Sequence, residues 1–530
     1  MAVRSYFNRT QKIADFGGNY QEGIIGQQPR FLNPILAQTN DTDRDLVRII
    51  FSSLLKYDDQ GNLVSDLAES YEIKDNGLAY EFFLRKDVKW HEKEPLTADD
   101  VVFTVKTIQN PEYKSPLKIN WSGVEVEKVD DYTVRFTLKN TFAPFLHNMT
   151  VGILPKHLWA GISAQNFPLA EYNLKPVGSG PYKFKELKKD KSGAVQFIEL
   201  EKNKNFYLKK PYINNLIFRF YQSEAAAVQA LNKRQVDGLN FISTAQKSKI
   251  IRRDINVYQI SLPRYYGVFF NQTQSKPLSD KTVRLALAYA TDKKEIVERV
   301  LGGNGLSVDS PLLPGLLGYT TETKIYDFAP EHARNILEAN NWKDNDNDGL
   351  REKKIGGEEI KLEITLITTD WPELKDAANL LKEQWEKLGA KINLETINLR
   401  MIQEDYIRPR NYQALLFGEV LEADPDPFAF WHSSQKRDPG LNLSLYDNKK
   451  VDKLLEEARQ ILDPETREKK YKEFQELLIN DLPAVFLYSP AYLYPVDTKI
   501  KGISFKNLSL PSQRFSQIEN WHIKTDRVWK

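Results

Sequence analysis

The chain has 530 residues, of which 41% are hydrophobic and 28% are charged. This composition supports large hydrophobic cores and excludes an intrinsically disordered chain, and at about 150 residues per domain the length indicates three to four domains or lobes. The net charge is only +2, which argues against a dedicated nucleic-acid-binding protein because such proteins need a basic surface. The absence of cysteine excludes disulfides, thiolate catalysis and Cys-ligated metal centres.

The sequence contains no apolar run of the roughly 18 residues that a transmembrane helix requires. Its first twenty residues include Arg4, Arg9, Lys12 and Asp15 and lack the apolar stretch of a signal peptide. We therefore expect either a cytoplasmic protein, or an exported one whose signal and membrane anchor are not part of this sequence.

In the first third of the chain the pattern predicts two strands with a helix between them. Tyr80–Leu84 and Tyr132–Leu138 alternate polar residues with β-branched and aromatic ones, as strands do. Thr97 fits the N-cap of an amphipathic helix over Val101–Ile108, and Asp100 stands where a capping box usually has Glu.

Further along, the pattern predicts a βαβ unit, with a strand at Lys361–Thr368, a helix at Asp376–Leu388 and a strand at Lys391–Ile397. A helix over Pro464–Ile479 and a buried strand at Val485–Tyr488 follow. Because helices and strands alternate without a polar linker, we expect lobes built from discontinuous segments, whose connections can act as hinges.

One segment has the spacing of a calcium loop. Asp344, Asp346 and Asp348 follow the D-x-D-x-D-G pattern, but the twelfth position holds Ile355 instead of the usual Glu. Glu352 is a further candidate ligand. The sequence favours an Asx-rich turn here, with a weak calcium site as the alternative, and no other cofactor is expected.

The strongest candidates for acid–base catalysis are Asp424 and Asp426, which alternate with prolines. The prolines fix an extended turn in which each Asp can bond backbone amides, and no neighbouring residue completes a catalytic set. Hydrolase-elbow, P-loop and histidine metal motifs are missing from the sequence. We therefore expect that the chain is not an enzyme.

Several segments, in order, resemble the bacterial extracellular solute-binding proteins of family 5, the receptors of peptide and nickel ABC importers. The resemblance extends from about Pro34 to about Gly502. The matching segments are Leu67–Tyr71, the signature region Val88–Val101, Pro176–Tyr182, Val283–Ala290 with Asp292, Asp424–Pro427 with Phe430–Ser433, and Tyr446–Asn448 with Val451 and Asp452.

The resemblance implies an α/β, two-lobed periplasmic-binding-protein (Venus-flytrap) fold with an extra α+β domain and hinge strands between the lobes. Lobe I would comprise residues 1–50, 176–273 and 491–530. The extra domain would comprise residues 51–175, and lobe II residues 274–490.

The resemblance also implies capture of a ligand in the cleft between the lobes, hinge closure, and recognition of the closed form by a membrane permease. The expected ligand is an oligopeptide, held as an extended chain through its main-chain groups. We expect an extracellular or periplasmic monomer that is tethered to the membrane outside this sequence.

Ten residues match segments of the family that contact ligand or line the cleft: Gln38, Asn40, Trp121, Tyr265, Tyr266, Asn271, Glu419, Glu422, Asp424 and Trp431. In peptide-binding members an acid just before the Asp-Pro pair binds the peptide's amine. Depending on a one-residue gap, that place is Leu421 or Glu422 here, and Glu419 and Asp424 are neighbours that could also serve.

Three alternatives stay open. The same fold could bind an oligosaccharide, a nickel chelate or an opine; the nine tryptophans keep the first option open, and the six histidines disfavour the second. A hydrolase or transferase would use Asp424 and Asp426. A scaffold with a degenerate cleft would show no thermal shift with any ligand.

Overall fold

The computed structural model describes residues 10–529, so Arg4, Arg9 and the first residues of the expected lobe I lie outside the described residues. Unit 1 of the chain comprises residues 1–260 and 492–530, and unit 2 comprises residues 261–491. Both units mix helices with β-sheets, which confirms the predicted α/β class. Within residues 10–529, no helix is long and apolar enough to cross a membrane.

The chain passes from unit 1 to unit 2 at the end of β13 (Ile255–Ser261) and returns within β21 (Ala484–Asp497). The lobe boundaries that the resemblance implies, after residues 273 and 490, stay predictions. At the start of unit 2, β14 (Arg264–Phe270) pairs along its whole length with β20 (Ala414–Val420).

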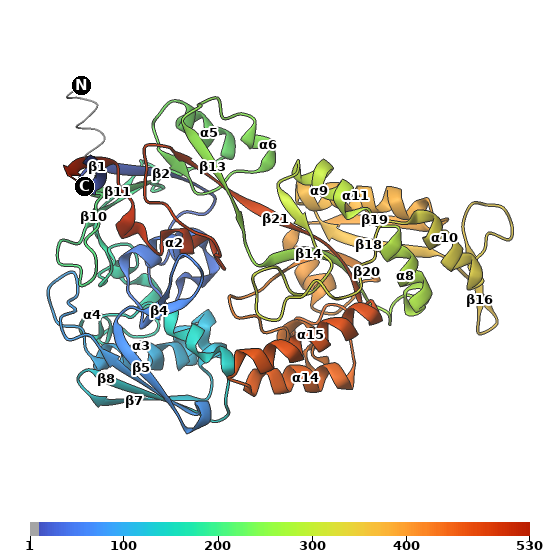
Figure 1. Cartoon of the computed structure of the whole chain (residues 1–530), viewed down its shortest axis with the longest axis horizontal. Helices are drawn as coiled ribbons and strands as arrows, with labels where there is room; N and C mark the ends of the chain where they lie inside the picture. The colour runs from blue at the N-terminus through green and yellow to red at the C-terminus, as the bar shows by residue number, and fades with distance from the viewer. Residues whose placement is uncertain (1–9, 530) are drawn as a thin grey trace. The chain divides into compact units, whose positions relative to one another are not determined.

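The larger sheet of unit 1 has β2 near its centre, parallel to both of its neighbours. Its strands, in spatial order, are β9 (Tyr182–Lys189), β10 (Val195–Lys202), β11 (Asn215–Tyr221), β2 (Asn19–Ile25), β12 (Gly238–Leu239) and the last part of β21. In a separate two-stranded sheet β1 (Thr10–Asp15) pairs with β22 (Lys524–Trp529), so the first and last described strands lie side by side (Figure 1). The helices of unit 1 are α2 (Asp41–Ile50), α3 (Ala98–Gln109), α4 (Lys156–Trp159), α5 (Glu224–Asn232) and α6 (Thr244–Lys247).

A second, antiparallel sheet of unit 1 consists of β5 (Ala68–Lys74), β6 (Ala79–Leu84), β8 (Thr133–Leu138) and β7 (Val124–Asp130), in that order, and the pair β3 (Leu55–Tyr57) and β4 (Leu63–Ser65) precedes it. The two strands that the sequence predicts in this region are confirmed by β6 and β8, and the predicted helix between them is confirmed by α3. The Thr97 amide donates to the Asp100 carboxylate at 2.9 Å, as expected at the start of α3. Since residues 51–175 fall within unit 1 as a whole, a separate extra domain stays a prediction.

The sheet of unit 2 contains β19 (Lys391–Ile397), β18 (Glu363–Thr369), β20, β14 and the first part of β21, which also pairs with β15 (Gly305–Ser307). A hairpin of β16 (Glu352–Ile355) and β17 (Glu358–Lys361) stands apart from it. The helices are α7 (Lys276–Ser279), α8 (Lys281–Tyr289), α9 (Lys293–Leu301), α10 (Pro330–Ala339), α11 (Pro372–Glu386), α12 (Leu399–Met401), α13 (Phe428–Trp431), α14 (Lys449–Gln460) and α15 (Pro464–Asp481).

The predicted βαβ unit is confirmed by β18, α11 and β19, in which the two strands are parallel. The late helix is confirmed by α15, whose N-cap Asp463 accepts the Thr466 amide at 2.8 Å. The predicted strand Val485–Tyr488 is the first part of the longer β21.

Helices cover both faces of the unit 2 sheet, and successive residues of each strand point to opposite faces. In β20, Ala414 and Leu416 pack in one core with α8 to α11, whereas Leu415 packs in the other with α13 to α15. Figure 1 shows α9 and α11 on one side of β18 and β20, and α14 and α15 on the other. Side chains of β14 and β20 can therefore belong to one site only if they point to the same face of the sheet.

Candidate ligand-binding site

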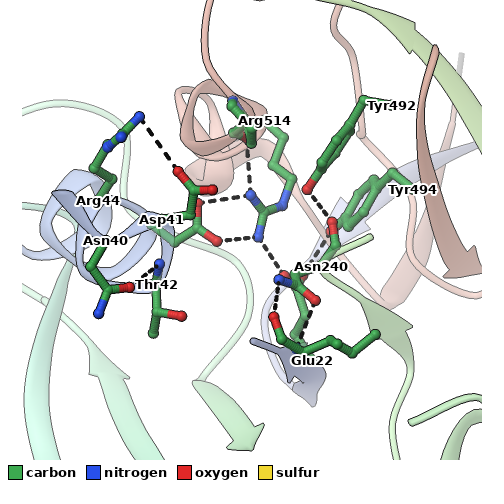
Figure 2. A network of polar contacts seen from close by, with 12 residues as sticks. Glu22, Asn40, Asp41, Thr42, Arg44, Asn240, Tyr492, Tyr494 and Arg514 are labelled. Carbon is green, nitrogen blue, oxygen red and sulfur yellow. Dashed lines mark hydrogen bonds and ion pairs between the residues drawn. The ribbon is translucent and has the colours of Figure 1, made fainter. Parts of the chain in front are cut away.

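In unit 1 the predicted contacts Gln38 and Asn40 lie just before α2. The Asn40 side chain accepts the Thr42 amide at 2.9 Å and donates to the Gln28 carbonyl at 2.8 Å, so it caps the helix (Figure 2). Gln38 is half-buried and lines a small, partly open pocket of about 60 Å³.

Close to this segment, unit 1 contains a buried network of charges that the sequence analysis does not identify. Arg514 Nη2 donates to Glu22 Oε1 and Asp45 Oδ2, each at 2.6 Å, and Nη1 donates to Asp45 Oδ1 at 2.8 Å. The Tyr20 and Tyr494 hydroxyls donate to Glu22 Oε2 at 2.6 and 2.8 Å. Figure 2 shows Arg514 reaching toward Glu22, with Tyr494 beside it.

All three charged groups of the network are buried, with Arg514 only 1% exposed. Burial raises the pKa of Asp45 to about 6 although Arg514 opposes the shift. Burial also lowers the pKa of Arg514, but Asp45 and Glu22 outweigh it and hold that pKa well above its ordinary value. One signal in the sequence points to this network: Glu22 follows Tyr20 by two residues in β2, so an acid occupies an inward position of a strand.

Two other predicted contacts are interior residues. Trp121 is 2% exposed and packs against the Phe136 and Phe145 rings. Asn271 is buried in unit 2, where it donates to the Arg410 carbonyl at 2.9 Å and accepts from the Thr273 hydroxyl at 2.7 Å. Both side chains stabilise the fold where they lie, and their contact with a ligand stays a prediction.

The two neighbouring tyrosines of β14 point to opposite faces of the sheet. Tyr265 is fully buried in the core that includes Trp431, and both rings pack against Phe486. Tyr266 is half-buried and packs on the other face, with its ring centroid 5.3 Å from that of Tyr488. The structure therefore brings Tyr265 and Trp431 together but not Tyr265 and Tyr266.

Glu419 lies opposite Tyr265 in the β20–β14 pairing, and the Tyr265 hydroxyl donates to its Oε2. Its Oε1 has no hydrogen-bond partner within residues 10–529. Burial raises the pKa of Glu419 to about 8, against the lowering effect of the Tyr265 hydrogen bond. A carboxyl whose pKa is raised in this way holds its proton more strongly than an exposed one, and it is poorly suited to pair with an ammonium group.

The two residues that could align with the amine-binding acid have different surroundings, as do the acids that follow them. Leu421 is buried, and its amide donates to the Pro263 carbonyl at 2.7 Å, whereas Glu422 is exposed. Asp424 forms an ion pair with Arg467. Asp426 binds Arg459, with both carboxylate oxygens 3.0 Å from its Nε. Of these acids, Glu422 has the most accessible side chain.

The predicted calcium ligands Asp344, Asp346 and Asp348 lie together in unit 2, and Glu352 joins them. The three aspartates lie in the loop before β16 and Glu352 is the first residue of β16, so none of them belongs to the group of residues around β14 and β20.

Comparison with known proteins places the chain in a family. The model of the bacterial extracellular solute-binding proteins, family 5 Middle, matches residues 62–442. The oligopeptide-binding protein AppA of Bacillus subtilis is 30% identical over 513 residues, which cover 95% of this chain and 91% of that protein. A dipeptide-binding protein of Escherichia coli is 27% identical over 468 residues and 83% of each chain.

The solved structure of B. subtilis AppA in complex with a nonapeptide has a TM-score of 0.75 and 29% identity, and the alignment covers 97% of this chain and 100% of that one. Since the family model matches more than half of the sequence, this chain belongs to the bacterial extracellular solute-binding proteins of family 5. The predicted resemblance and the periplasmic-binding-protein fold are confirmed.

Replacing Arg514 by Met should lower the free energy of unfolding by about 3–5 kcal/mol, because it leaves two buried carboxylates without their cation. Urea unfolding measures the loss. The control is Arg400→Met, which breaks a 3.3 Å ion pair between the exposed side chains of Arg400 and Glu404 and should cost no more than about 1 kcal/mol. Equal stability of the two variants would contradict the role of the network.

Glu419→Gln should remove a pH dependence of stability. The pKa of Glu419 is raised in the folded state, so its contribution is fully present below the unfolded pKa near 4.5 and is lost as pH rises through about 8. In urea unfolding at pH 5 to 8, the variant should gain stability relative to the wild type by up to about 1.4 kcal/mol per pH unit. Glu395→Gln, at an exposed position of β19, should leave the slope unchanged. A variant with the wild-type slope would show that Glu419 is ionised in the fold.

Proposed function

We propose that the chain is the peptide receptor of an ABC importer and binds an oligopeptide for delivery to a membrane permease. One observation carries the proposal: 30% identity to an oligopeptide-binding protein across 95% of the chain, together with the same fold in a nonapeptide complex of that protein. A family of extracellular solute-binding proteins needs such a permease to move its ligand inward. The expected lobe closure, the monomeric state and the membrane tether stay predictions.

The positions of the tryptophans favour peptide over oligosaccharide. A sugar-binding site stacks its ligand on accessible aromatic faces. Seven of the nine tryptophans are among the most buried side chains of the structure, and only Trp371 and Trp529 are exposed, at 59% and 68%. Their number therefore reflects the size of the cores.

We assign the recognition of the peptide's α-amine to Glu422. Glu419 is buried in a core, which raises its pKa, and Asp424 and Asp426 form ion pairs with Arg467 and Arg459. Glu422 lies two residues after the end of β20 and is exposed, so an ammonium group can reach it without opening a core.

The same contacts disfavour catalysis by the Asp-Pro pair. An acid–base pair needs carboxyl groups that can exchange protons with a substrate. Here Asp426 is bound to a guanidinium of α14 through both oxygens, and Asp424 is bound to one of α15. These ion pairs tie the segment after β20 to two helices of unit 2, which is a structural role.

Peptides of two to nine residues should raise the melting temperature of the purified chain in thermal-shift experiments, whereas oligosaccharides should not. A ligand at a hundred times its Kd stabilises the native state by about 2.7 kcal/mol, which such experiments resolve readily. Isothermal titration calorimetry then gives Kd for the best peptide. Stabilisation by sugars alone would contradict the proposal, and no response to any ligand would favour a scaffold.

Glu422→Gln should weaken binding of that peptide by about ten- to a hundredfold, because it removes a charge-assisted contact with the α-amine. The N-acetylated peptide, which lacks the ammonium group, should bind wild type and variant equally. Glu395→Gln removes an exposed charge from β19 of the same unit and should leave both affinities unchanged. An unchanged affinity of Glu422→Gln for the free peptide would remove this assignment while leaving peptide binding intact.

A further inference from the structure

Four carboxylates converge in unit 2 away from the proposed peptide contacts. The loop that follows α10 carries Asp344, Asp346 and Asp348, and Glu352 is the first residue of β16. One oxygen from each of the four residues lies within 4.8 Å of the others. The three aspartates are exposed, and Glu352 is only 3% exposed.

Glu352 is the member of this group that points to a ligand. Its Oε1 accepts the Asn345 amide at 2.7 Å and the Asn345 side chain at 2.6 Å. Its Oε2 is buried and has no hydrogen-bond partner within residues 10–529. A buried carboxylate oxygen without a donor is costly, and it is satisfied when a cation occupies the space beside it.

The sequence around the group explains how it forms. Gly349, at φ +86°, and Asn347, at φ +59°, provide the left-handed backbone that the tight loop requires. The backbone of Glu352 pairs with that of Lys343 on the other side of the loop, with N–O distances of 2.8 and 3.0 Å. Glu352 thus stands at the ninth position of the D-x-D-x-D-G loop and is held against its first residues, although the usual twelfth-position Glu is Ile355.

The surrounding charges also favour a cation. Lys361, in β17, donates to Asp348 at 2.8 Å and offsets only part of the negative charge of the four carboxylates. Carboxylate oxygens are the ligands of hard cations, and a group of four carboxylates suits Ca²⁺ better than Mg²⁺, which demands near-ideal octahedral geometry and keeps its waters.

We propose that Asp344, Asp346, Asp348 and Glu352 bind a calcium ion that fastens the loop after α10 to the hairpin of β16 and β17. The site is independent of the peptide-binding proposal. With Glu at position nine and a lysine nearby, the affinity should fall in the range of extracellular calcium modules, about 10⁻⁴–10⁻³ M.

The test is calorimetric titration of the chelator-treated full chain with CaCl₂, together with its melting temperature with and without calcium. We expect saturable binding of one ion and a rise in melting temperature. Asp346→Asn and Glu352→Gln should each weaken calcium binding at least about tenfold. Glu359→Gln is the matched control, because it removes an exposed carboxylate from the neighbouring β17 and should leave binding intact.

The Glu352→Gln variant keeps a side-chain oxygen that can accept from Asn345, so it should still fold. If this variant does not fold, calcium binding by Asp346→Asn, at an exposed position, is the test of the proposal. Absence of saturable binding up to about ten times the expected Kd would overturn the proposal. Binding that Asp346→Asn leaves unchanged, or an equal effect of MgCl₂, would overturn it as well.

Discussion

The buried ion network around Arg514 is the constraint on which unit 1 depends. Two carboxylates, from β2 and α2, are held in the interior by one guanidinium. Their desolvation is offset only while every partner is present, so the segments that carry them must meet in one arrangement. Arg514 comes from the last part of the chain, and Tyr494 from β21, which also contributes Phe486 to the core of unit 2. The network therefore fixes the place at which the returning chain joins the first strand of the large sheet.

Local signals in the sequence predict much of the secondary structure. The capping pair Thr97 and Asp100 marks the start of α3, and the apolar periodicity around residues 361–397 predicts β18, α11 and β19 with their parallel pairing. Each element is predicted from its own residues, where propensity and capping decide the conformation, and the parallel pairing follows from the βαβ order.

Contacts between distant residues could not be predicted in the same way. Glu22 and Arg514 are separated by 492 positions. The inward position of Glu22 in β2 marks a buried acid, but nothing local to it identifies Arg514 as its partner. The candidate site shows the same limit, since the sequence aligns Leu421 or Glu422 with the amine-binding acid and leaves Glu419 and Asp424 as neighbours that could also serve. The strand register distinguishes them, because it turns Glu419 into the core opposite Tyr265, while an ion pair with α15 engages Asp424.

Mass spectrometry of whatever the purified chain releases on heat denaturation tests the central claim, that this family 5 protein is a peptide receptor. The account predicts peptides within a narrow range of lengths. Release of an oligosaccharide or of a metal with its chelator would contradict it.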